Sequence, residues 1–337
     1  MTNKATQISD NSLYNKISSI LEESRKFVAT TVNTAMVQTY FEIGRLIVEE
    51  EQHGNVRAEY GKETLKNLSI KLTANYGKGF SQRNLEQMRQ FYLVYSTQIP
   101  QTVSDQFTLS YSHYLFLMRI ENPEERKFYE IESSQNNWSL RELKRQFDSA
   151  LYERLSLSKD KEKVKSLAIQ GQIIENPCDI VKDPYVLEFL GLPEKAYYSE
   201  SELESRLIEK LENFLLELGK GYTFVGRQVR LSFDEKHFFV DLVFYNRLLQ
   251  CFVLIDLKIG ELTHQDLGQM QMYVNYYDRF VKLDHENKTI GIILCKKKSD
   301  SLVEITLPED NNQIFASKYQ TVLPNKEDLI KLIQAED

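Results

Sequence analysis

The stretch from Phe238 to Gly260 constrains the fold most strongly, because charged residues stand inside two apolar runs there. Its sequence, FFVDLVFYNRLLQCFVLIDLKIG, has two runs of strand length, and NRLLQ between them suits a short hairpin connection. Asp241 lies in the first run, and Asp256 and Lys258 lie in the second. An isolated buried carboxylate costs several kcal/mol unless it is paired, neutralised or bound to a metal ion. The stretch therefore predicts a strand pair built around a charged site.

Strand alternation places these charges relative to one another. Asp256 and Lys258 are two residues apart and share one face of their strand. The other face carries Cys251, Val253, Ile255 and Leu257. Antiparallel pairing of the two runs would bring Asp241 alongside Asp256. Two converging carboxylates repel each other, and a divalent cation removes that penalty.

The residue types of this cluster favour one kind of chemistry. Oxygen ligands without Cys or His suit Mg²⁺ or Mn²⁺ rather than zinc. A lysine beside such an ion can orient an attacking water and stabilise developing charge, which fits phosphodiester hydrolysis. The alternative is that Asp256 and Lys258 end the strand at the surface, with Asp241 as an ordinary ion-pair partner.

The elements around the charged stretch predict an α/β domain with a mixed sheet. A helix is predicted for residues 199–221, ended by Gly219 or Gly221. Strands are predicted at 222–233, 236–246 and 249–258, followed by a helix from His264 to Phe280. The rest of the chain predicts a strand in 288–298, an edge strand in 314–324 and a short helix in 325–336.

Residues 1–155 predict a mainly helical domain, with apolar residues such as Leu13, Ile17 and Phe41 at helical spacing. The glycine-containing turn YGKGF precedes Ser81, a predicted N-cap. Residues 156–185 are rich in charge, Pro and Asp and are interpreted as a linker. A second domain is then expected at 186–337.

Composition excludes several classes of protein. The chain has 337 residues, 42% hydrophobic and 27% charged, which is typical of a folded protein, and its net charge of −7 argues against a uniformly basic surface. The three cysteines lack metal-ligand spacing and are interpreted as free thiols, which fits a reducing cytosol. The polar N-terminus lacks a signal-peptide core, and no apolar run approaches the ~20 residues of a membrane span. We therefore expect a cytoplasmic protein without membrane contact.

The ordered set of segments resembles the YhcG-type branch of the PD-(D/E)xK nuclease superfamily, a bacterial family with a helical N-terminal domain. ELESRLIEKLENFLLELGKGYTFVGRQVRL is similar to its leading helix and first strand, FFVDLVFYNRLLQCFVLIDLKIG to its catalytic hairpin, and HQDLGQMQMYVNYYD to the next helix. YGKGFSQRNLEQMRQFY and LSYSHYLFLMRI extend the likeness over nearly the whole chain. The resemblance implies a restriction-endonuclease-like C-terminal domain, with a mixed central sheet flanked by helices, after a mainly α-helical N-terminal domain.

The resemblance also implies roles for individual residues. Asp241 and Asp256 correspond to the acidic metal ligands, and Lys258 corresponds to the lysine of the motif. Asp256 stands where the family commonly has Glu, and Val240 stands where a proline-like residue is expected. Glu204, on the leading helix, matches a further carboxylate of the metal site; the alternative is a solvated helical glutamate, as expected for Glu202 and Glu209.

Two supporting positions flank the predicted hairpin. Gln269 and Tyr273 form a QxxxY pattern similar to a motif of RecB-like nucleases, and their i,i+4 spacing puts both on one helix face. Gln271 is a neighbouring alternative. Gln228, on the strand face opposite Arg227, is the predicted polar residue facing the site and the nucleic acid.

In the N-terminal domain, Arg83, Asn84 and Arg89 are predicted to contact DNA, because they follow a turn in a helix-turn-helix-like segment. The alternative is that this helix packs in a bundle with solvated arginines. The acidic EEEQ segment at residues 49–52 is expected to lie away from any DNA-binding surface.

The leading hypothesis is a Mg²⁺- or Mn²⁺-dependent endonuclease that hydrolyses DNA phosphodiester bonds. The alternative is a non-catalytic DNA-binding or assembly protein that retains a nuclease fold, although the intact Asp and Lys pattern argues against it. No phosphate loop, dinucleotide fingerprint or nucleophile elbow indicates another α/β enzyme. By analogy, restriction-like cutting of both strands would suggest a homodimer.

Overall fold

The structure is a computed structural model that describes residues 3–53, 58–96, 107–157, 161–192, 198–233 and 235–335. Its contacts divide the chain into two units, Met1–Leu140 and Arg141–Asp337. None of the helices in the described part of the chain has the length and apolar character that crossing a membrane requires.

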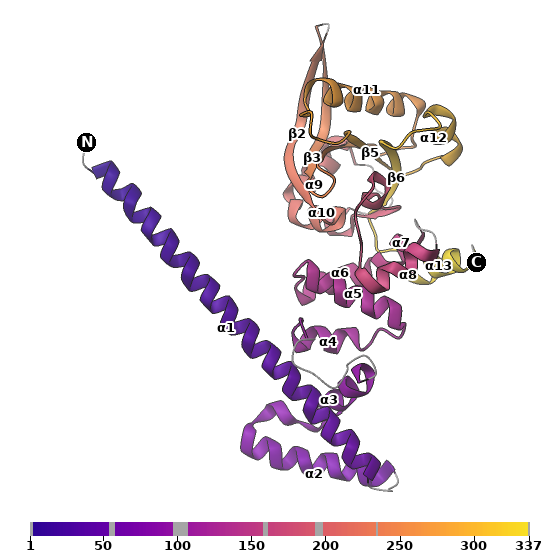
Figure 1. The fold of residues 1–337 in the computed structure, drawn as a ribbon. Helices are drawn as coiled ribbons and strands as arrows, with labels where there is room; N and C mark the ends of the chain where they lie inside the picture. Colours follow the sequence, from indigo (N-terminus) through magenta and orange to yellow (C-terminus); the bar gives the residue numbers. More distant parts are fainter. Residues whose placement is uncertain are drawn as a thin grey trace. The chain divides into compact units, whose positions relative to one another are not determined.

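The first unit is mainly helical, as the sequence predicts (Figure 1). Its helices are α1 (Asn3–His53), α2 (Ala58–Tyr76), α3 (Gln82–Tyr95), α4 (Tyr111–Leu117) and α5 (Pro123–Gln135). The second half of α1 packs on α3, where Phe41 meets Phe91 with ring centroids 5.6 Å apart. Ser81 caps α3 by accepting a hydrogen bond from the backbone N–H of Asn84, which confirms the predicted start of this helix.

Gly44 allows α1 and α3 to approach closely. A Cβ atom at this position would lie 2.1 Å from the carbonyl oxygen of Met88, closer than backbone atoms can come. Gly44→Ala is therefore expected to destabilise the first unit by about 1–3 kcal/mol, although alanine is otherwise the better helix former. Urea unfolding checks this against Gly79→Ala, whose Cβ would meet nothing within 4 Å. A Gly44→Ala variant as stable as the Gly79→Ala variant would contradict the close packing.

The second unit contains a mixed six-stranded sheet among its described residues, as predicted. The strands are β1 (Tyr185–Val186), β2 (Tyr222–Phe233), β3 (Lys236–Asn246), β4 (Cys251–Leu257), β5 (Ile290–Cys295) and β6 (Ile314–Gln320), in the spatial order β1-β6-β5-β4-β3-β2. Strands β2, β3 and β4 pair antiparallel, whereas β4, β5, β6 and β1 pair parallel. The helices are α6 (Leu140–Asp148), α7 (Leu151–Leu157), α8 (Lys161–Gln170), α9 (Glu200–Glu209), α10 (Leu211–Leu218), α11 (His264–Phe280), α12 (Asp300–Thr306) and α13 (Lys326–Ala335).

Helices cover both faces of this sheet, which is why its central strands are almost continuously apolar. On one face, Leu203 of α9 and Phe214 of α10 join Ile255 of β4 in a buried cluster. On the other face, Met270 of α11 packs in a cluster with Leu254 of β4. Alternate residues of β4 thus enter different clusters, as strand alternation predicts.

Three features differ from the sequence prediction. The single helix expected at 199–221 is divided at Lys210 into α9 and α10, because the backbone there has φ −113° and ψ 32°. Strand β6 lies between β5 and β1, so it is not an edge strand. The segment 156–185, interpreted as a linker, contains helix α8 and the first residue of β1. Strand β1 has only two residues, too few for a strand pattern in the sequence. Residues 158–160 lie outside the described part of the chain.

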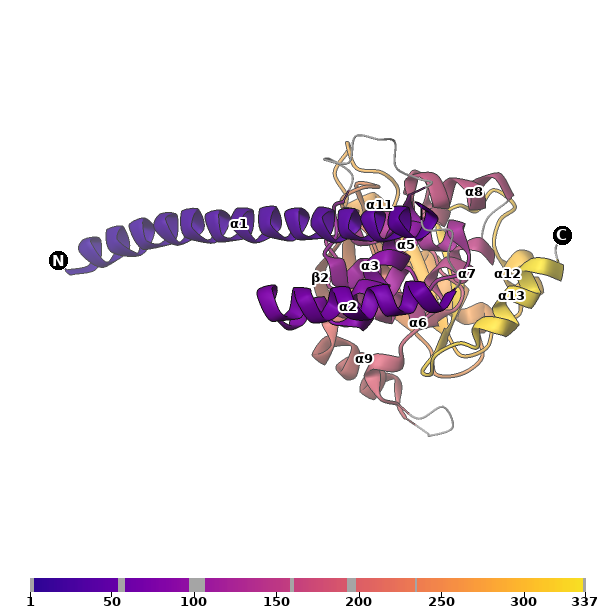
Figure 2. The ribbon, with the colours of Figure 1, turned by 90° about the horizontal axis from the view of Figure 1, so that it is seen from below.

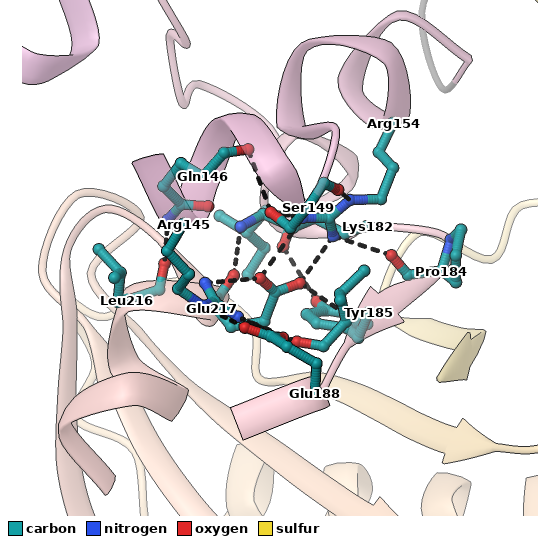
Figure 3. A network of polar contacts seen from close by, with 12 residues as sticks. Arg145, Gln146, Ser149, Arg154, Lys182, Pro184, Tyr185, Glu188, Leu216 and Glu217 are labelled. Atoms are coloured by element: carbon teal, nitrogen blue, oxygen red, sulfur yellow. Dashed lines mark hydrogen bonds and ion pairs between the residues drawn. The ribbon is translucent and has the colours of Figure 1, made fainter. Parts of the chain in front are cut away.

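A buried ion cluster holds helices α6 and α7 against the rest of this unit (Figure 3). Glu217 of α10 is fully buried, and its Oε1 accepts hydrogen bonds from Arg154 Nη1 (2.6 Å) and the backbone N–H of Val186 (2.9 Å). Arg145 Nη1 lies 3.2 Å from Glu217 Oε2, and Lys182 donates to the Glu217 carbonyl oxygen. Burial alone would raise the pKa of Glu217, but Arg154, Lys182 and Arg145 lower it to about 2.

Candidate active site

The charged residues of the segment Phe238–Gly260 lie where strands β3 and β4 stop pairing. The β3–β4 ladder ends at the pair Leu242–Ile255, and Asp241 and Asp256 are the next residues of the two strands. Asp241 Oδ2 accepts a hydrogen bond from the backbone N–H of Leu257 (2.8 Å). A side-chain carboxylate thus takes the place of a backbone carbonyl, and it fixes Asp241 against the end of β4.

Asp256 is buried, with 3% of its surface exposed, beside the lysine of the same strand face. Its Oδ2 lies 2.8 Å from Lys258 Nζ. This contact is an ion pair, and no other donor reaches Oδ2 among the described residues. Burial, and then the charge of Asp241, raise the pKa of Asp256 to about 6, although Lys258 acts in the opposite direction. A further positive charge at this oxygen would favour the ionised form.

Gln228 links the two other candidate carboxylates. Its Nε2 donates hydrogen bonds to Glu204 Oε2 (2.7 Å) and to Asp241 Oδ1 (3.0 Å). Gln228 has a φ of 47°, which non-glycine residues rarely adopt. It lies opposite Asp241, between the paired residues Arg227–Leu242 and Val229–Val240. The pKa of Glu204 is raised above its ordinary value. Burial is the main cause, the hydrogen bond from Gln228 acts in the opposite direction, and the charge of Asp241 adds to the increase. Residues predicted separately on a helix and two strands are therefore in contact.

The ability of this cluster to hold a metal ion can be tested on its donor atoms. Within the described ranges, no group of three or more His, Cys, Asp and Glu side chains is arranged to hold a metal ion. Glu204, Asp241 and Asp256 therefore do not form a preformed three-carboxylate cage. The buried Oδ2 of Asp256 and the nearby Asp241 still suit Mg²⁺, which is commonly held by one or two carboxylates and keeps several waters.

Gln269 and Tyr273 of α11 connect this helix to β3 near Asp241. The Gln269 side-chain amide donates to the Tyr273 hydroxyl, which donates to the carbonyl oxygen of Phe239 (2.9 Å). Phe239 precedes Asp241 by two residues. Burial raises the pKa of Tyr273 to about 12, so the hydroxyl remains a hydrogen-bond donor at neutral pH. The alternative residue Gln271 is exposed.

Two acidic residues near Lys258 were not predicted from the sequence. Lys258 Nζ lies 3.9 Å from Asp266 Oδ1 and 4.0 Å from Glu200 Oε2. Asp266 forms a capping box with Thr263 at the start of α11. The T-x-x-D pattern of Thr263 and Asp266, shortly after β4, could have indicated a helix start and so placed Asp266 near Lys258. No comparable pattern points to Glu200. Burial lowers the pKa of Lys258, but Asp256 and the other acids raise it above its ordinary value.

The three residues of the N-terminal domain that were predicted to contact DNA lie on α3, in different surroundings. Arg83 is exposed. Asn84 donates to the Gly79 carbonyl oxygen (3.0 Å), and Arg89 Nε lies 2.6 Å from Glu51 Oε2. Glu51 belongs to the acidic EEEQ segment, so this segment lies beside one of the candidate DNA-binding residues. The reason is that packing of α1 on α3 brings residues 38 positions apart in sequence into contact.

The mixed sheet and the carboxylates and lysine at the end of its hairpin define the class of PD-(D/E)xK nuclease domains. Residues 178–334 match the family model of the YhcG PDDEXK nuclease domain, and residues 16–154 match that of the DUF1016 N-terminal domain. The chain is also 39% identical over 345 residues to "Putative nuclease YhcG" of Escherichia coli (strain K12), with 94% of this chain and 92% of that protein covered. The chain therefore belongs to the YhcG family.

A solved structure is also similar to part of the chain. It is the crystal structure of a repair endonuclease from Pyrococcus abyssi, with 15% sequence identity and a TM-score of 0.26. The similar region covers 39% of this chain and 50% of that chain.

Proposed function

We propose that this protein is a Mg²⁺- or Mn²⁺-dependent endonuclease that hydrolyses DNA phosphodiester bonds. The observation that carries the proposal is the buried Asp256, whose Oδ2 has no donor beside it other than Lys258 among the described residues. Membership of a nuclease family supports it. Strongly shifted pKa values cluster at functional sites, and the pKa of the buried Asp256 is raised to about 6.

Asp241 and Asp256 are the residues that would hold the ion. Glu204 would lie beside them, because Gln228 donates hydrogen bonds to both Glu204 and Asp241. When bound, such an ion polarises a phosphate oxygen and lowers the pKa of a coordinated water. Asp241 is held in place by the Leu257 N–H and by Gln228. The site therefore orients its carboxylates through backbone and amide hydrogen bonds that do not depend on the substrate.

Lys258 would act as a cation in this site. Its pKa is raised, so its ammonium group stays protonated at neutral pH. Asp256, Asp266 and Glu200 surround Nζ and restrict its position. A protonated lysine can donate a hydrogen bond to the attacking water or to a phosphate oxygen and stabilise the charge that develops there. Gln269 and Tyr273 would act as positioning residues, because they hold β3 next to Asp241.

DNA contacts by Arg83, Asn84 and Arg89 remain a proposal. The exposure of Arg83 supports its role most directly. Arg89 would have to exchange its ion pair with Glu51 for a phosphate.

A cleavage assay tests the proposed activity on single-stranded, duplex and branched DNA, with Mg²⁺, Mn²⁺ or EDTA. We expect metal-dependent cleavage, and Lys258→Ala should reduce its rate at least ~100-fold, as the loss of one charge-stabilising donor does in other sites. The matched control is Lys288→Ala, because Lys288 is exposed near the opposite end of the parallel strands.

Two results would contradict the proposal. Lys258→Ala cutting at the wild-type rate would refute the site assignment. The absence of cleavage on all three substrates, with no stabilisation of the fold by either metal ion, would instead support a non-catalytic protein that retains the fold.

A further inference from the structure

Helix α1 carries an apolar face that its own unit leaves uncovered. Eight large apolar side chains between residues 13 and 32 are each 48% to 72% exposed. They are Leu13, Tyr14, Ile17, Ile20, Leu21, Phe27, Val28 and Val32, and we call them the α1 stripe. An exposed apolar surface of this extent on a folded protein marks an interaction site.

The α1 stripe is one continuous face. At 3.6 residues per turn, its eight side chains fall within an arc of about 140°. The packed part of α1 comes later: Val37 is buried, and Tyr40, Phe41 and Gly44 contact α3 or α4. Figures 1 and 2 show the first half of α1 extending beyond α2 and α3. Since an isolated helix is only marginally stable in water, this half needs a partner.

The spacing of the stripe indicates that the partner is another helix. Tyr14, Leu21 and Val28 are spaced seven residues apart, and so are Leu13, Ile20 and Phe27. A seven-residue apolar repeat keeps its seam facing a second helix in a left-handed supercoil.

We propose that the α1 stripe packs against α1 of a second copy of this chain and forms a homodimer. The eight side chains together expose roughly 800 Å², which is about what each partner buries in a stable interface. Five charged residues lie between positions 13 and 36, namely Lys16, Glu22, Glu23, Arg25 and Lys26. Their near balance allows two copies to approach without repulsion, and it offers no complement to a strongly charged partner. The proposal does not rest on nuclease activity.

The mass of the full chain in solution, measured by light scattering over a range of concentrations, tests this pairing. We expect a dimer, and Leu21→Glu/Val28→Glu should raise its dissociation constant at least ~100-fold, because four apolar side chains per dimer become charged. The control is Thr30→Glu/Asn33→Glu, which adds the same charge on the opposite side of the helix, where both residues are exposed. This control should remain a dimer, and circular dichroism verifies that both variants fold.

Hydrogen exchange of the amides of residues 13–36 separates the second copy from other partners. We expect protection that falls on dilution and is lost in Leu21→Glu/Val28→Glu. A chain that is monomeric at all concentrations would overturn the proposal, as would a dimer that survives this variant. Protection independent of concentration would also overturn it, because the stripe would then be covered by the chain itself.

Discussion

Replacing Glu217 by glutamine is expected to destabilise the second unit by about 3–5 kcal/mol. Glutamine keeps the shape of the side chain but removes the charge that lies 2.6 Å from the fully buried guanidinium of Arg154. Arg145 and Lys182 would also lose the attraction of this charge. An uncompensated buried cation costs far more than the same pair contributes relative to an apolar replacement.

Urea unfolding at neutral pH measures this loss. The single tryptophan of the chain, Trp138, belongs to the first unit, so a transition seen by circular dichroism but not by its fluorescence reports the second unit. Glu188→Gln is the control, because Glu188 also pairs with Arg145 but its side chain is 19% exposed, whereas that of Glu217 is fully buried. That change should cost less than Glu217→Gln, because Arg145 keeps Glu217 as a charged partner. If Glu217→Gln cost no more than this control, the cluster would not be a principal source of stability.

The acid sensitivity of the protein should report the same residue. The pKa of Glu217 is lowered from 4.5 to about 2 in the folded protein. Because the folded state binds this proton more weakly, the stabilisation is present above about pH 4.5 and is lost as the pH falls towards 2. Glu217→Gln should remove this part of the pH dependence, and urea unfolding between these pH values measures the difference.

The local pattern of the sequence predicted the elements that carry the candidate site. Strands β2 and β3 and helix α11 begin and end at the predicted residues, because each has a long periodic pattern between clear turn or capping signals. Alternation along β4 placed Asp256 and Lys258 on one face, and their 2.8 Å ion pair agrees with it. The roles of these residues remain predictions until cleavage is measured.

Other features depended on contacts that no local pattern contains. Arg154 and Glu217 are 63 positions apart, so nothing in either segment indicated that a helical glutamate would be buried between arginines. Gln228 lies opposite Asp241 with a left-handed backbone, and its amide donates to Asp241 Oδ1, a contact that neither strand's own pattern contains. Arg89 and Glu51 met through helix packing in the same way. Long-range packing therefore decides which charged residues remain available to a ligand.

Asp256→Asn is expected to change stability and activity in opposite directions. The pKa of Asp256 is raised from 3.8 to about 6, so the folded state binds this proton more tightly than the unfolded chain does. Wild-type stability should therefore fall as the pH rises from about 4 to 6, and the full cost should persist above that range. At pH 8 without divalent metal, the variant should be more stable than wild type by up to about 3 kcal/mol, since one pKa unit corresponds to ~1.4 kcal/mol.

The same change should abolish DNA cleavage, because the buried oxygen that would hold the ion is replaced by a neutral amide or carbonyl. Mg²⁺ should stabilise the wild type and leave the variant unaffected, since only an ion that binds the folded state adds to its stability. Urea unfolding at pH 4 and pH 8, in EDTA and in Mg²⁺, measures both effects, with Asp284→Asn as an exposed control.

A variant less stable than wild type in EDTA at pH 8 would mean that Asp256 is held mainly by its ion pair with Lys258. Equal stabilisation of both proteins by Mg²⁺ would place the metal ion elsewhere. A site that weakens the fold until a cation arrives is the physical signature that separates a metal centre from a structural salt bridge.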